Sequence, residues 1–555
     1  MTRPRAPWQW RSAAVVQALS PLWWLPQAAL LAMAIADLQG GAGVAAMLQP
    51  AAGIVLLGVL RAGCEAWSSQ HLFDAARAQL TAWRQQATRA LAERSPLDRT
   101  RLPSGAAASA LAEQAEAVLP WLTRYQSAVW RVRTVPLLLL LPVAWFSWVA
   151  ATVLLVAAPL IPMFMAIVGW RAKAASEAQW LQWNDMNAFL LDRLRGLPTL
   201  RALQAVERTA GQLHHHADQL RQRTMRVLRI AFLSSAVLEL FSALGVAMVA
   251  AYVGFHLLGI LPFGTWGERL TLGEGLFILL LAPAFFEPLR ELATVWHDRA
   301  SGEAAMQALQ QLSARGLALP DGMPLASTTQ ASAPVQAPGL QVRGLGFAFP
   351  GEPWLLQAFD LDVQPGEKIA LVGDSGAGKT VLMSLLAGLI PATTGSIAID
   401  GIPLSATSLA QLRPRMAWMG QHPHVFAGSV RHNVSLGRPG LDQVDVQDAI
   451  ALAGLGEVAQ AHPGVALGEG GTGLSGGENA RLALARLALA RGADLLLIDE
   501  PTAHLDSETA EQIAQALLHL AQGRTLLVAT HDPVLAARMD RVVDLNTLVG
   551  DRRQA

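Results

Sequence analysis

Long apolar stretches dominate the first half of the chain and alternate with polar ones. A membrane-spanning helix needs about 20 predominantly apolar residues, and stretches of roughly that length lie at 22–38, 43–63, 230–258 and 272–295. The nearly uncharged run 135–170 is too long for one span, so we expect two spans there, joined by a tight turn near Trp148. The pattern therefore predicts six membrane-spanning helices.

Two long polar segments, 65–133 and 171–229, separate these spans and carry apolar residues at three- and four-residue spacing. That spacing predicts helices that extend the spans far out of the membrane. Both segments and the N-terminus are rich in arginine, whereas the opposite loops nearly lack it. The asymmetry places the N-terminus and the long segments in the cytoplasm. The first 38 residues are not expected to be a cleavable signal peptide, because their apolar stretch is long and leads directly into a second one.

The second half of the chain has a different character. Residues 317–338 contain four prolines among Ser, Thr, Ala and Gln, which is typical of a linker. We therefore expect a membrane domain at 1–316, a linker at 317–338 and a soluble domain at 339–555.

Composition agrees with a membrane protein. Hydrophobic residues make up 52% and charged residues 15% of the chain, whereas soluble chains carry about 25% charged residues. The formal net charge of +0 gives no sign of a nucleic-acid partner. Cys64 is the sole cysteine, which excludes an internal disulfide and argues against dithiol redox chemistry carried by this chain. Lysine occurs only at 173, 368 and 379, so a lysine inside a motif is informative.

One such lysine completes a phosphate-binding loop between an apolar strand at 368–372 and a predicted helix at 381–388. Small residues let successive backbone N–H groups point at a phosphate, and the helix N-terminus adds a favourable potential. The motif predicts that the lysine contacts the outer phosphates of a nucleotide and that the threonine hydroxyl binds Mg²⁺. Its eight positions are Gly373, Asp374, Ser375, Gly376, Ala377, Gly378, Lys379 and Thr380.

A second apolar strand, 495–498, ends in two carboxylates, Asp499 and Glu500. After a phosphate loop, this pattern predicts that Asp499 holds Mg²⁺ and that Glu500 polarises the attacking water as general base.

The run Leu474, Ser475, Gly476, Gly477, Glu478 resembles the signature of ABC ATPases and lies just before the second strand, where that family has it. A serine hydroxyl and paired glycines at a helix start form a phosphate cradle. In the family this cradle serves the nucleotide held by the opposite subunit, so the resemblance implies a dimer of ATPase domains. It also implies the fold class: an all-α six-helix transmembrane domain of the exporter type, followed by an α/β P-loop ABC ATPase domain.

The resemblance assigns further roles by position. Gln421 matches the family's magnesium-contacting glutamine, Asp506 ends its D-loop, and His531 matches the switch histidine that contacts the terminal phosphate. Phe349 matches the aromatic residue that stacks on adenine, where tyrosine is common. Glu478 likewise replaces the usual glutamine of the signature. Neither departure threatens ATP binding.

The membrane domain has a narrower resemblance. Segments 194–201, 229–241 and 283–292 resemble the CydD family of subunits. That family pairs with CydC, a second half-transporter, in a bacterial inner-membrane complex needed for cytochrome bd assembly. Export of the thiols cysteine and glutathione, and handling of haem, have both been assigned to it. The resemblance therefore implies a heterodimeric exporter with ATP and Mg²⁺ as cofactors, haem as an alternative ligand, and the N-terminus and ATPase domain in the cytoplasm.

Some residues of the membrane half bear on the substrate. Charge inside a membrane is costly and often functional, which makes Glu239 a candidate, whereas for Glu287 and Arg290 we favour helix packing at the inner end. For the remaining candidates we favour plain structural roles. These are an interfacial belt of Trp145, Phe146 and Trp148, lone histidines at 256 and 297, and a solvated tract of His214, His215 and His216.

Two alternatives remain open at this point. One is a homodimeric ABC exporter of lipid or peptide, which would assemble without a second kind of chain. The other is an assembly factor in which ATP drives conformational change without transport.

Overall fold

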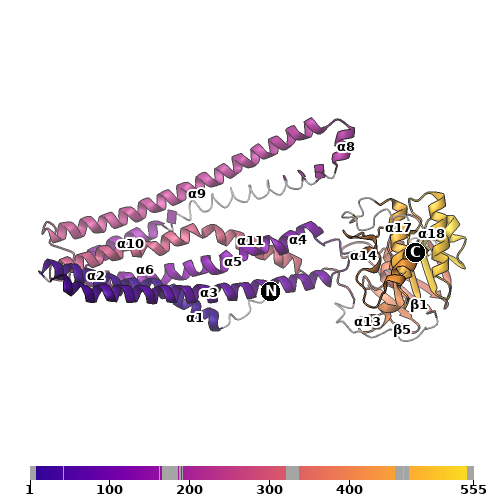
Figure 1. Cartoon of the computed structure of the whole chain (residues 1–555), viewed down its shortest axis with the longest axis horizontal. Coiled ribbons are helices and arrows are strands. Elements are labelled where there is room, and N and C mark those ends of the chain that lie inside the picture. Colours follow the sequence, from indigo (N-terminus) through magenta and orange to yellow (C-terminus); the bar gives the residue numbers. More distant parts are fainter. Residues whose placement is uncertain are drawn as a thin grey trace. The chain divides into compact units, whose positions relative to one another are not determined.

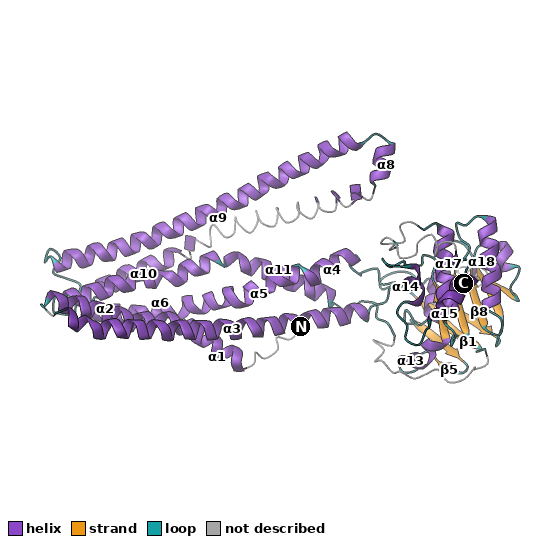
Figure 2. Cartoon of the chain, in the orientation of Figure 1, coloured by secondary structure: helices purple, strands orange, loops and turns teal. Residues whose placement is uncertain are grey.

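The computed structural model describes residues 8–41, 43–161, 163–164, 186, 189–190, 192–194, 196–314, 316–320, 337–456, 467 and 474–546. Its internal contacts divide the chain into two units. The helical unit comprises Met1–Thr88 and Leu102–Ser313, and the sheet unit comprises Arg89–Arg101 and Ala314–Ala555. Figure 1 shows the helical character of the first unit, and Figure 2 shows that the strands belong to the second.

The described part of the helical unit contains several long helices and a few short ones. Within the described residues, five helices are long and apolar enough to cross a membrane, and Trp148–Ile161 forms a shorter apolar helix. The labelled helices are α1 (Trp8–Leu19), α2 (Trp24–Gln39), α3 (Leu48–Ala92), α4 (Ser104–Ala112), α5 (Val118–Pro120), α6 (Gln126–Phe146), α8 (Leu197–Ala202), α9 (Val206–Leu257), α10 (Leu272–Thr294) and α11 (Trp296–Leu312).

The predicted spans coincide closely with these helices. The span expected at 22–38 is α2, and the one expected at 272–295 is α10. The span expected from residue 43 begins at Leu48, because Val44–Met47 forms a 3₁₀ turn first. The turn expected near Trp148 falls at Ser147, whose hydroxyl oxygen lies 2.8 Å from the Gly264 carbonyl oxygen. The end of the span after this turn lies outside the described residues.

The polar segments are helical where they are described. Helix α9 has 52 residues and α3 has 45. At about 1.5 Å per residue, α9 is about 78 Å long, which far exceeds the roughly 30 Å of a hydrocarbon core. Both helices therefore extend well beyond any bilayer they cross.

Helix α10 is the centre of the helical core and packs against α6, α9 and α2. Ile278, Leu281 and Phe286 on α10 are fully buried. A side chain at Gly245 on α9 would collide with the Phe286 ring, so the glycine permits the close approach of α9 and α10.

The sheet unit contains two sheets in the part of the chain that the structure describes. An antiparallel sheet has the order β2-β1-β4-β5, and a parallel sheet has the order β6-β7-β8-β3-β9. The strands are β1 (Leu340–Phe347), β2 (Leu356–Val363), β3 (Lys368–Val372), β4 (Thr394–Ile399), β5 (Ile402–Pro403), β6 (Met416–Met419), β7 (Leu495–Asp499), β8 (Thr525–Ala529) and β9 (Arg541–Asp544).

Helices cover the parallel sheet, so its inner strands are buried and are apolar almost throughout. Every residue of β7 and β8 is buried. The helices are α12 (Lys379–Leu386), α13 (Leu409–Leu412), α14 (Val430–Ser435), α15 (Gln443–Leu452), α17 (Gly476–Ala488), α18 (Ser507–Leu520) and α19 (Pro533–Ala536).

A short segment from the first part of the chain, Arg89–Arg101, packs within the sheet unit. Ser95 N–H donates to the Leu317 carbonyl at 2.9 Å, and Leu319 N–H donates to the Glu93 carbonyl at 2.7 Å. Leu97 packs against the apolar core between the two sheets. Much of the linker expected at 317–338 lies outside the described residues.

Candidate active site

The parallel sheet gathers the predicted chemical residues at one edge. Carboxyl ends of neighbouring parallel strands meet at the same edge of a sheet, which is where α/β folds bind ligands. Gly373 follows β3, Gln421 lies just beyond β6, Asp499 ends β7 and His531 lies just beyond β8. The strand order thus brings together residues that are more than 150 positions apart in the sequence.

The predicted phosphate loop forms a tight turn between β3 and α12. Gly376 and Gly378 have φ of 89° and 91°, a left-handed conformation that favours glycine. The Lys379 ammonium donates to the carbonyl oxygens of Gly373 at 2.7 Å and Asp374 at 3.3 Å, so it lies across the loop. Asp374 N–H donates to the Asn546 side chain at 3.2 Å, which ties the loop to the chain just beyond the end of β9. The loop therefore presents backbone N–H groups and one ammonium at the start of a helix.

Asp499 lies at the buried end of β7 with 1% of its surface exposed. Neither of its carboxylate oxygens has a partner at full hydrogen-bond geometry among the described residues, although the adjacent Thr380 hydroxyl lies close enough to lower the pKa of the carboxyl. Burial raises the pKa of this carboxyl, and the nearby Glu500 carboxylate raises it further, against the opposing effects of Thr380 and Lys379. A buried carboxylate of this kind lacks a compensating partner and is suited to a cation.

Glu500 has a left-handed backbone with φ of 51°, a strained conformation that clusters at functional sites. Its N–H donates to the Ala529 carbonyl at 2.8 Å, which fixes the turn against β8. One carboxylate oxygen lies 2.6 Å from Nδ1 of His531, and the other lies 3.9 Å from the Lys379 ammonium. The Glu500 side chain is 8% exposed and that of His531 is 64% exposed, so the histidine faces outward from a buried acid.

The predicted signature begins helix α17 with a capping box. The Ser475 hydroxyl accepts a hydrogen bond from Glu478 N–H at 3.3 Å, and the Glu478 carboxylate accepts one from Ser475 N–H at 2.6 Å. Glutamate and glutamine both serve at this position of a capping box. This geometry explains why Glu478 can stand where glutamine is usual. Gly476 and Gly477 then form the first helical residues, where backbone N–H groups have no partner within the helix.

The remaining predicted residues lie on other elements of the sheet unit. Gln421 is exposed beyond β6. Asp506 caps α18, where its carboxylate accepts from Thr509 N–H at 2.9 Å, and this hydrogen bond lowers the pKa of the carboxyl. Phe349 follows β1 and packs edge-to-face with Phe347.

Sequence reasoning missed Arg99, whose guanidinium lies over the ring of the predicted adenine-stacking residue Phe349. It is one of many arginines in a polar segment, and no signal in the sequence distinguishes it.

The residues at this edge fit a magnesium ion. Mg²⁺ takes oxygen ligands, usually one or two protein groups together with substrate phosphates. The Asp499 carboxylate and the adjacent Thr380 hydroxyl supply such oxygens, and the carboxylate oxygens are buried without another partner.

Charged residues meet between α9 and α10 in the helical unit. Arg290 lies 3.1 Å from the Glu239 carboxylate and 3.5 Å from that of Glu287. All three side chains are substantially exposed, at 41%, 70% and 67%. The structure therefore joins Glu239 to the pair that sequence reasoning treated separately.

Two histidines of the membrane half, which were candidates for binding iron, contact neighbouring residues of the helical unit. His256 is buried, and its Nε2 accepts from Leu270 N–H at 3.3 Å. His297 pairs with Asp298 at 3.1 Å. Within the described residues, no group of three or more His, Cys, Asp or Glu side chains is arranged to hold a metal ion.

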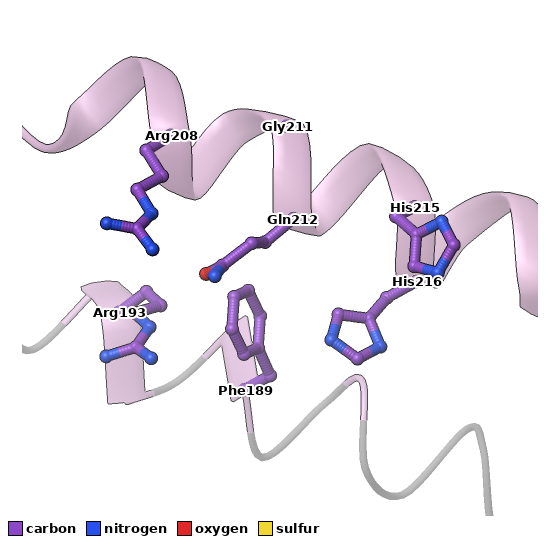
Figure 3. A pocket seen from close by; sticks show the side chains of 7 residues that line it. All are labelled: Phe189, Arg193, Arg208, Gly211, Gln212, His215 and His216. Atoms are coloured by element: carbon purple, nitrogen blue, oxygen red, sulfur yellow. The ribbon is translucent and has the colours of Figure 1, made fainter.

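Two members of the histidine tract line a surface pocket of about 490 Å³ (Figure 3). The Arg193 guanidinium lies 5.0 Å from the centroid of the Phe189 ring, which in turn lies 5.0 Å from the His216 ring. The lining residues are Phe189, Arg193, Arg208, Gly211, Gln212, His215 and His216.

Comparison with known families accounts for both units. The ABC transporter transmembrane region matches residues 13–274, and the ABC transporter ATPase family matches residues 356–503. The second match covers the phosphate loop, the signature and the Asp499–Glu500 pair.

Curated relatives extend the similarity over most of the chain. The glutathione/L-cysteine transport system ATP-binding/permease protein CydD of Haemophilus influenzae is 36% identical over 77% of this chain and 72% of its own length. CydD of Escherichia coli is 35% identical over 88% of this chain and 82% of its own length. CydC of Bacillus subtilis, with the same system name, is 32% identical over 72% of this chain and 67% of its own. The chain therefore belongs to the ABC transporter family, as an ATP-hydrolysing, exporter-type member that carries a membrane region and an ATPase domain on one chain and resembles the CydD transporters.

Proposed function

We propose that this chain is one half of a heterodimeric exporter that moves cysteine or glutathione out of the bacterial cytoplasm through the inner membrane. Similarity to CydD and CydC proteins named for glutathione and L-cysteine transport carries the proposal. The same names make a CydC-like chain the favoured partner. They do not mention haem, so a thiol is the favoured substrate.

The charged cluster between α9 and α10 is the candidate contact for such a substrate. A charged side chain exposed to lipid is costly, so exposed charges on membrane helices face a cavity or a partner. Cysteine and glutathione both carry a carboxylate and an ammonium at neutral pH. Arg290 offers a partner for the carboxylate, while Glu239 and Glu287 offer partners for the ammonium.

The ATPase residues supply the driving force in this proposal. The backbone N–H groups of the phosphate loop and the Lys379 ammonium bind the phosphates, and the Glu500 carboxylate takes a proton from the attacking water. His531, whose Nδ1 lies 2.6 Å from that carboxylate, would orient it and contact the terminal phosphate. Asp499 and Thr380, with Gln421, would hold Mg²⁺, which neutralises charge on the phosphates when bound. Ser475, Gly476 and Gly477 would complete the site of the opposite subunit, with Asp506 beside the shared interface.

Inverted membrane vesicles test the proposal. We expect ATP-dependent uptake of radiolabelled cysteine or glutathione into vesicles that hold this chain with a CydC-like partner. Glu500→Gln serves as the hydrolysis control. Glu239→Gln and Arg290→Gln should reduce uptake while ATP binding persists. Glu303→Gln, which removes an exposed carboxylate paired with Arg299 at 2.8 Å on α11, is the matched control and should transport normally.

Other results would favour the alternatives. Full activity without a second kind of chain, indifferent to both thiols, would point to a homodimeric exporter of lipid or peptide. ATP hydrolysis with no accumulation of any thiol would point to an assembly factor or, if haem stimulates hydrolysis, to haem as the ligand.

A further inference from the structure

The ring of Phe349 has one face covered by a residue from a distant part of the chain. Phe349 itself is buried, with 8% of its surface exposed, and Phe347 packs against it with ring centroids 5.0 Å apart. The guanidinium carbon of Arg99 lies 4.1 Å from the centroid of the Phe349 ring. A base that stacks on Phe349 must therefore share this side of the ring with Arg99.

The backbone near Arg99 is anchored by hydrogen bonds, whereas its side chain makes only solvent-exposed polar contacts. Arg94 pairs with Ala318 in an antiparallel bridge, and the Asp98 carboxylate accepts from Leu317 N–H at 3.2 Å. In contrast, the Arg99 side chain is 63% exposed, and its Nη1 donates to the two oxygens of the exposed Glu352 carboxylate at 2.5 and 2.7 Å. An exposed ion pair of this kind contributes little to stability. The guanidinium can therefore move while its Cα stays in place.

We propose that Arg99 binds the nucleotide base, with adenine held between the Phe349 ring and the Arg99 guanidinium. Atoms in contact lie about 3.5–4.0 Å apart, so a base between the two planes requires the guanidinium to withdraw by about one such layer. The planar guanidinium stacks well on aromatic faces and on nucleic-acid bases. When the base binds, the guanidinium leaves the face of the Phe349 ring and stacks on the face of the adenine ring, so little stacking energy is lost. The family motifs do not include this position.

The position of Arg99 in the chain links the proposed contact with the base to a membrane helix. Arg99 lies a few residues beyond the end of α3 at Ala92, and α3 is one of the apolar helices long enough to cross a membrane. Base binding therefore acts on a segment that is covalently continuous with a membrane helix. The phosphates, in contrast, are bound by residues of the phosphate loop.

Binding of two ligands to the full-length chain in lipid nanodiscs tests the proposal. ATP is compared with ribose 5′-triphosphate, which lacks the base, in a Glu500→Gln background that prevents hydrolysis. We expect Arg99→Ala to weaken ATP binding about 2- to 5-fold, which corresponds to the free energy of one exposed cation–π contact. Binding of ribose 5′-triphosphate should be unchanged. Phe349→Ala should show the same pattern. Arg101→Ala removes an equal charge from an exposed position in the same segment and is the matched control.

Four results would overturn the proposal. Unchanged ATP binding in Arg99→Ala would mean that the guanidinium does not contact the base. Tighter ATP binding would mean that Arg99 competes with the base for the ring. Equal weakening of both ligands, or equal weakening in Arg101→Ala, would assign the effect to charge alone. Because Arg99 is exposed, its substitution is not expected to impair folding, which a thermal melt of each variant verifies.

Discussion

Replacing Asp499 by asparagine should stabilise the sheet unit while it abolishes hydrolysis. Asp499 is 1% exposed, and neither carboxylate oxygen has a partner at full hydrogen-bond geometry among the described residues. Asparagine has nearly the same shape without the charge. An unsatisfied buried polar group costs about 1–3 kcal/mol and a charged one costs more. Because asparagine still leaves an amide unsatisfied, we expect a net gain of about 1–2 kcal/mol in the free energy of unfolding at neutral pH.

The gain in stability from Asp499→Asn should increase as the pH rises. Burial raises the folded-state pKa of Asp499 above its ordinary value of 3.8. The contribution of this carboxyl to stability is therefore most favourable below pH 3.8 and is lost as the pH rises through the raised folded-state pKa. Asparagine does not titrate, so the advantage of Asp499→Asn should grow as the pH rises across that window.

Differential scanning fluorimetry of the full-length chain in EDTA, at a series of pH values, measures this effect. For a unit of this size, 1 kcal/mol corresponds to a shift of about 2–4 °C in Tm. Addition of Mg²⁺ and ATP should stabilise the wild type more than the variant, which lacks a metal ligand. Asp506→Asn is the control, because an exposed capping aspartate tolerates asparagine. A variant that melts below the wild type in EDTA at neutral pH would refute the reasoning.

Three other substitutions have defined outcomes. Glu500→Gln should reduce ATP hydrolysis at least about 100-fold while ATP binding persists, and retained turnover would exclude Glu500 as the base. Gly316→Ala should loosen the segment Arg89–Arg101, because the added methyl would collide with the Asp98 carboxylate. We expect a loss of about 1–3 kcal/mol in stability, measured as faster hydrogen exchange in that segment. Arg415→Met should lower the Tm by leaving Asp494 without its partner at 2.8 Å, with partial rescue at lower pH because burial already raises the pKa of Asp494.

The motifs of the ATPase domain were readable from the sequence because each motif is local. The phosphate loop needs small residues, a lysine and a threonine in consecutive positions, and the structure forms the expected turn there. The capping box at Ser475 and Glu478 is likewise a four-residue pattern. The spans were readable because the bilayer imposes a length on every apolar helix. Boundaries were less accurate where a local turn competed with helix, as at Val44–Met47.

The tertiary structure decided which distant residues meet. The sequence by itself determined the two kinds of domain, the phosphate loop and the approximate spans, because these depend on local pattern and length. It did not reveal that Arg89–Arg101 packs within the sheet unit, that Arg99 covers Phe349, or that Arg290 joins Glu239 to Glu287. Such contacts arise from the packing of whole elements, and a lone arginine or glutamate has the same appearance in the sequence whether it faces solvent or a partner.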